Sequence, residues 1–113
     1  MTVKRMVLEI GMGTDIRGAD STKAASRALR DALWRNSLNI ADICGKRREE
    51  MIIDVHLGVP RPETVDHQVV LSVLPYGSAT LHVTDGGLEV PTDDGHDSTI
   101  IAHAAAVVSL DID

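Results

Sequence analysis

The sequence predicts one α+β domain over residues 1–113, with the element order β-α-β-α-β-β. We expect a mixed four-stranded sheet with both helices on one face. Three observations predict this fold. Residues 51–59 and 100–112 alternate apolar and polar side chains, as strands covered on one face do. Residues 22–36 place apolar side chains at helical spacing, and a chain of 113 residues is the size of a single domain.

The N-terminal third of the chain predicts a strand followed by a helix. Residues 3–10 are rich in β-formers and predict a strand. Asp20 or Ser21 is a suitable cap for the helix over 22–36. The apolar stripe of this helix is mostly alanine, so we expect the helix to lie close to the sheet.

The middle of the chain predicts a connector, a strand and a second helix. Residues 39–50 are expected to be irregular, and residues 51–59 to form a strand. Residues 62–74 carry four valines, which suit a strand as well as a helix. We favour a helix because the pattern runs for about a dozen residues, and because Glu63 and Asp66 are acidic residues in its first turn.

The C-terminal part predicts a hairpin, an exposed loop and a long strand. Residues 78–84 alternate as a strand, and the turn sequence 85–87 predicts that residues 88–90 continue as the second arm of a hairpin. Residues 92–98 are acidic and small, which predicts an exposed loop. Residues 100–112 form the last predicted strand.

Composition excludes several classes of partner. The net charge is −6 at pH 7 and only 2% of residues are aromatic, so we expect no binding to nucleic acid or to anionic membranes. The single cysteine, Cys44, suits a reducing compartment. The N-terminus carries no apolar segment of signal or membrane length, which predicts a cytoplasmic protein. No cofactor is predicted.

Residues 9–18 are the predicted functional segment, because three glycines here lie close to two carboxylates and a guanidinium. Glycines allow positive φ and close approach of a ligand, so we expect a shaped loop between the first strand and the first helix. The helix would direct its first amides and its positive dipole end at that loop, which favours an anionic ligand. The predicted ligand-binding residues are Gly11, Gly13, Arg17, Gly18 and Lys23.

The spacing Gly11-x-Gly13-x-Asp15-x-Arg17-Gly18 resembles the GxGxDxHG signature of a small, uncharacterised family of single-domain proteins found in bacteria and plants. The resemblance extends along the chain to Leu74-Pro75-Tyr76-Gly77 and Gly86-Gly87-Leu88. Arg17 replaces the histidine of the signature, so no imidazole role carries over to this position. The family implies a fold and a site but no activity.

The order of the predicted elements resembles that of the trimeric chorismate mutase fold, which is also found in reactive-imine deaminases and ring-opening amidohydrolases. Sites in those proteins lie between subunits or repeats. The uncovered face of the predicted sheet would combine apolar residues with Asp54, His56, His82 and His103. A homo-oligomer, trimeric or a multiple of three, would cover that face.

Three functions fit the sequence. The first is a small-molecule enzyme or binding protein with an intersubunit site for a polar or anionic metabolite, such as a hydrolase or lyase. Its predicted catalytic residues are Asp15, Glu9 and His56, because paired carboxylates and an imidazole are suited to general acid–base chemistry. The second is a non-catalytic assembly protein. The third is a divalent metal site built from Glu9, Asp15 and His56 or His103, which the charge of Arg17 disfavours, so no metal ligand is predicted.

Overall fold

The computed structural model describes residues 1–34 and 39–113. Within these residues the protein is a five-stranded sheet with three α-helices and two short 3₁₀ segments. The elements are β1 Val3–Asp15, α1 Ser21–Trp34, α2 Ile40–Ile43, η1 Arg48–Glu50, β2 Ile52–Gly58, η2 Pro62–Thr64, α3 His67–Leu71, β3 Ser78–Thr84, β4 Leu88–Pro91 and β5 Ser98–Asp111.

The sheet is organised around β5, which pairs antiparallel with β1 along one edge and with β2 along the other. β2 pairs in parallel with β3, which gives the order β1-β5-β2-β3 and a mixed sheet, as predicted. β4 pairs with the start of β5, beyond the end of β2. The predicted sheet of four strands with a β3–β4 hairpin is therefore wrong, because β4 bonds to β5 and makes a fifth strand.

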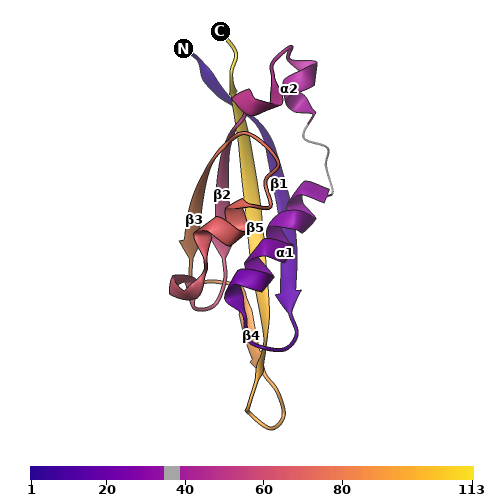
Figure 1. The fold of residues 1–113 in the computed structure, drawn as a ribbon, viewed down its shortest axis with the longest axis vertical. Helices are drawn as coiled ribbons and strands as arrows, with labels where there is room; N and C mark the ends of the chain where they lie inside the picture. Colours follow the sequence, from indigo (N-terminus) through magenta and orange to yellow (C-terminus); the bar gives the residue numbers. More distant parts are fainter. Residues whose placement is uncertain (35–38) are drawn as a thin grey trace.

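The molecule is long and narrow, with extents of 57 × 23 × 18 Å. Figure 1 shows α1 and α3 on the same side of the sheet, and both termini at the end opposite the loop between β4 and β5. The prediction that the helices cover one face is confirmed for these two. The hairpin of β4 and β5 extends beyond them as an arm.

α1 packs its alanine stripe directly onto β1 and β5. Asp20 caps the helix, since its Oδ1 accepts a 3.0 Å hydrogen bond from the Lys23 amide. The inner face of α1 is completely buried, and it consists of Ala24, Ala25, Ala28, Leu29 and Ala32. The predicted helix end at Asn36 lies outside the described residues.

Gly11 and Gly13 belong to β1 and neither has a positive φ. A Cβ on Gly13 would overlap the Ala28 amide and the Ala24 carbonyl of α1, and a Cβ on Gly11 would lie 2.8 Å from Ala32 Cα. The predicted glycine loop is therefore wrong for residues 11–15. These two glycines are needed because the helix backbone touches the strand backbone there.

Two further predicted elements differ. The predicted helix over 62–74 is two short pieces, because the extended residue Val65 ends η2 and Asp66 caps α3 by accepting from the amides of Gln68 and Val69. The connector over 39–50, predicted to be irregular, contains α2 and η1. The break before α3 reflects local capping by Asp66, which apolar periodicity does not report.

Candidate functional site

The side chain of Asp15, at the end of β1, holds the turn that leads into α1. It is 3% exposed, and its Oδ2 accepts a 2.9 Å hydrogen bond from the Asp20 amide. Its Oδ1 lies 3.6 Å from Arg27 Nη1 and 4.0 Å from Lys23 Nζ. Asp15 thus joins β1 to the first two turns of α1.

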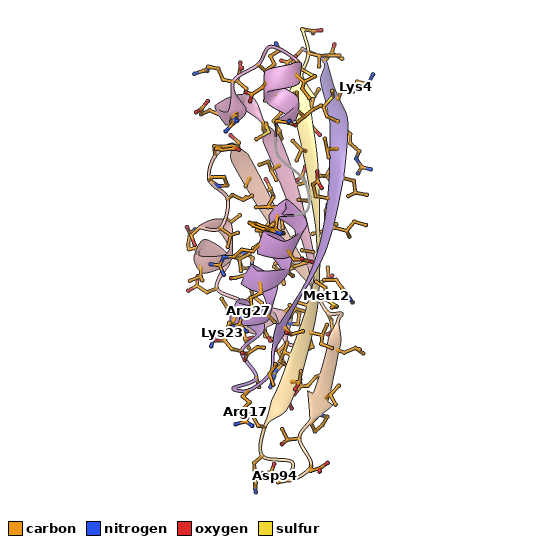
Figure 2. The ribbon with its side chains drawn as sticks, turned by 90° about the vertical axis from the view of Figure 1, so that its right-hand side faces the viewer. Lys4, Met12, Arg17, Lys23, Arg27 and Asp94 are labelled. Carbon is orange, nitrogen blue, oxygen red and sulfur yellow. The ribbon has the colours of Figure 1, made fainter. Side chains whose placement is uncertain are left out.

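Arg17 lies on the other side of this turn, near the loop that connects β4 and β5. Figure 2 shows Arg27, Lys23 and Arg17 following one another toward the tip that carries Asp94. Arg17 lines a hollow of about 450 Å³ together with Thr92, Asp93, Asp94 and Asp97. No ion pair links Arg17 to Asp15 in the described part of the chain. Asp15 and Arg17 belong to one predicted functional segment, but the hollow that Arg17 lines does not include Asp15.

Gly18 ties the same turn to the tip loop, which is residues 92–97 between β4 and β5. Its φ of +99° lies in the left-handed region that favours glycine, and its amide donates to both carboxylate oxygens of Asp97 at 3.0 and 3.1 Å. The hydrogen bonds from the Gly18 and Ser98 amides, with a smaller effect of the Arg17 charge, hold the pKa of Asp97 below its usual value. The hydrogen bonds from the His96 amide and the Thr92 hydroxyl likewise lower the pKa of Asp94, so Asp94 and Asp97 are charged at neutral pH and oppose an anion there.

A second hollow, of about 320 Å³, opens at the amino end of α1. It is lined by Gly18, Ala19, Asp20, Ser21, Arg61 and Thr64. Among the hydrogen bonds of the described residues, none uses the amides of Ser21 and Thr22, which belong to the first helical turn and have no partner within the helix. Arg61 places a guanidinium at this hollow, although no motif in the sequence indicates it.

Ala19 and Arg61 adopt backbone conformations that are uncommon for residues with a Cβ. Their φ angles are 49° and 51°, both left-handed. The two residues meet, because Arg61 Nη2 donates a 3.3 Å hydrogen bond to the Ala19 carbonyl. The guanidinium also lies 3.3 Å from Glu89 Oε1. Two strained residues are thus in direct contact at the wall of one hollow.

The three predicted catalytic residues do not come together. Glu9 is 2% exposed and faces the helices, and its burial raises the pKa of its carboxyl. It shares this face of β1 with Asp15 but lies six residues away, about 20 Å along a strand. His56 lies on the opposite, uncovered face of the sheet. The alternative metal site of Glu9, Asp15 and a histidine is therefore not assembled within one subunit.

His56 has neighbours that local sequence did not identify. Its ring stacks on that of His82, with centroids 4.7 Å apart and planes 14° apart. His82 Nε2 lies 3.1 Å from Asp54 Oδ1. The register places His56 opposite His82 across the parallel strands. The sequence feature that could have indicated this pair is a histidine at the matching position of each strand. The sequence indicated the shared strand face of Asp54 and His56 but not the partner strand.

Two general features of the described residues limit the possible sites. None of the described helices combines the length and the apolar character needed to cross a bilayer. No group of three or more His, Cys, Asp or Glu side chains in residues 1–34 and 39–113 is arranged to hold a metal ion.

Comparison with known proteins gives a family and a similar solved structure. The crystal structure of an FtsZ-like protein of unknown function from Nostoc punctiforme PCC 73102 is similar to this one, and the two chains are 41% identical in sequence. The similarity covers 98% of each chain with a TM-score of 0.88. No curated protein matches significantly. The family model described as "Conserved hypothetical protein (Lin0512_fam)" matches residues 5–108. The chain therefore belongs to this family of conserved hypothetical proteins.

Proposed function

We propose that the protein binds a small anionic metabolite in the hollow at the amino end of α1. The contact between Ala19 and Arg61 carries this proposal. Left-handed conformations of residues with a Cβ cost free energy, and such strain persists mostly where a ligand or a switch requires it. Here the strain sets a guanidinium next to the first turn of a 14-residue helix.

The chemistry of the hollow favours an anion. The first amides of α1 and the positive end of its dipole attract negative charge, and a guanidinium binds carboxylate or phosphate with two parallel hydrogen bonds. Glu89 holds Arg61 in the free protein, and a ligand anion would compete with this exposed carboxylate. Gly18 lines the hollow, and Lys23 lies in the first turn of α1. Gly11 and Gly13 contribute indirectly, by seating α1 on the sheet.

Arg17 remains an alternative ligand-binding residue of the same proposal. Its position among Asp93, Asp94 and Asp97 favours Arg61 as the anchor of the anion. Asp15 and Glu9 are buried at 3% and 2% exposure, so a metabolite would meet His56 as the accessible catalytic candidate. A hydrolase or lyase reaction would require a second subunit that brings His56 to a bound metabolite.

A homo-oligomer is part of the proposal, and a non-catalytic assembly protein is the second candidate. The side of the sheet opposite α1 and α3 exposes large apolar side chains, including Ile10 at 66% and Met12 at 53%. Association would remove them from water. The mixed sheet with α1 and α3 on one face supports a trimer of the chorismate mutase type, in which sites lie between subunits.

Phosphate-dependent thermal stabilisation tests the binding site. We expect inorganic phosphate to raise the melting temperature of the wild-type protein and to have no such effect on Arg61→Ala, because ligand binding stabilises the folded state by mass action. Arg47→Ala is the matched control, since its guanidinium is exposed and Arg47 immediately precedes η1, far along the chain from the amino end of α1.

The outcome separates the candidates. An equal response of Arg61→Ala and the wild type would remove Arg61 from the site. Loss of the response in Arg17→Ala instead would place the anion at the tip loop. No response of the wild type to phosphate would favour the assembly protein.

A further inference from the structure

The face of the sheet opposite α1 and α3, here called the open face, is apolar along β1 and β4. In an antiparallel or parallel sheet every second side chain points to one face, and the register assigns Leu8, Ile10 and Met12 of β1 to the open face. A β-bulge between Arg5 and Val7 sets this alternation. The most exposed large apolar side chains of the open face are Ile10 (66%), Leu88 (57%), Met12 (53%), Val90 (52%) and Leu8 (51%).

The centre of the open face carries almost no fixed charge. The chain has a net charge of −6, and 25% of its residues are charged. Between Leu8 and Thr14 of β1, across β2, β3 and β4, and over residues 98–110 of β5, the only Asp, Glu, Lys or Arg on this face is Asp54. Arg5 of β1 and Asp111 of β5 lie on the same face at the end near the termini. A second copy carries the same charge of −6, so copies repel least where they meet through a neutral face.

The other titratable groups of the open face are three histidines. His56 and His82 stack on each other, and His82 contacts Asp54 at 3.1 Å. His103 lies on β5 opposite Met12 of β1 and Gly58 of β2. β1 and β4 present no ionisable group to this cluster in the central region. Histidine is the side chain whose charge normally changes between about pH 5 and 8.

We propose that the open face docks a second copy of this chain and that protonation of its histidines weakens the contact. The inference rests on the homo-oligomer of the proposed function. Neutral imidazoles can be buried at modest cost, whereas imidazolium ions must lose their hydration. Asp54 can compensate the charge of His82, which leaves His56 and His103 as uncompensated cations. Associated copies therefore bind fewer protons than free copies, so association weakens as the pH falls.

Sedimentation equilibrium of the full chain at about pH 8 and about pH 6 tests this inference. We expect a homo-oligomer at the higher pH and a dissociation constant at least about tenfold larger at the lower pH. The double variant His56→Gln, His103→Gln should lose most of this change. The control His67→Gln, His96→Gln alters exposed histidines of α3 and the tip loop and should behave as the wild type.

A second pair of variants locates the surface. Ile10→Glu, at a side chain 66% exposed on the open face, should prevent association without unfolding the chain. Ile43→Glu, at a side chain 72% exposed on α2, should not affect it. Association that survives Ile10→Glu, or an acid response that survives the histidine double variant, would overturn the inference. A monomer at both pH values would instead remove the homo-oligomer itself.

Discussion

Gly13→Ala is expected to lower the free energy of unfolding by about 3 kcal/mol or more. The added Cβ would overlap backbone atoms of Ala28 and Ala24 and would lie 2.6 Å from the carbonyl carbon of Arg27. Backbone atoms cannot rotate away as a side chain does, so α1 must move off the sheet and open the alanine-lined core. Urea unfolding followed by the helical circular dichroism signal measures the loss.

Gly58→Ala is the matched control for this experiment. Gly58 is also a strand glycine, but its added Cβ would lie 3.7 Å from the nearest atom, Gly86 Cα, which is an ordinary contact. We expect its free energy of unfolding to stay within about 1 kcal/mol of the wild-type value. Equal stability of Gly13→Ala and Gly58→Ala would contradict the close packing of α1 on β1.

Asp15→Ala is expected to lower the free energy of unfolding by about 2 to 3 kcal/mol. The substitution leaves the Asp20 amide without its 2.9 Å acceptor and removes the anion between Arg27 and Lys23. Both cations are about half exposed, so water screens these ion pairs and reduces the cost of losing them. Thermal and urea unfolding of the variant measure the cost, and Asp15→Asn should lose less because it keeps an oxygen acceptor.

Asp42→Ala provides the comparison for Asp15→Ala. Its ion pair with Arg48 is shorter, at 3.0 Å, but both side chains are about half exposed. We expect a loss below about 1 kcal/mol, because exposed ion pairs contribute little. If Asp42→Ala were as costly as Asp15→Ala, the burial of Asp15 would not explain its effect.

Sequence predicted the elements whose signal is local. The alternation in 51–59 and 78–84 predicted β2 and β3, and the alanine stripe predicted both α1 and its close approach to the sheet. Gly11 and Gly13 predicted a loop, but they are required by close contact with the backbone of α1, which lies more than ten residues further along the chain. β4 was assigned to the wrong partner because a turn sequence does not report which strand the next segment pairs with.

The candidate site was less predictable, since it depends on contacts across the fold. Asp15 and Arg17 are two residues apart, yet the turn directs one to α1 and the other to the tip loop. Arg61 lies between two prolines, and only the folded chain brings it to Ala19. His82 stacks on His56 because of the register of β3 against β2, and the sequence of either strand alone does not specify this register.

The location of the bound anion tests the central proposal most directly. In a phosphate titration followed by the NMR shifts of backbone amides, we expect the largest changes at Ser21 and Thr22, with a smaller change at Gly18. These changes should be absent in Arg61→Ala and retained in Arg47→Ala. Shifts confined to the tip loop around Arg17 and Asp97, or equal shifts in Arg61→Ala and the wild type, would contradict a site at the amino end of α1.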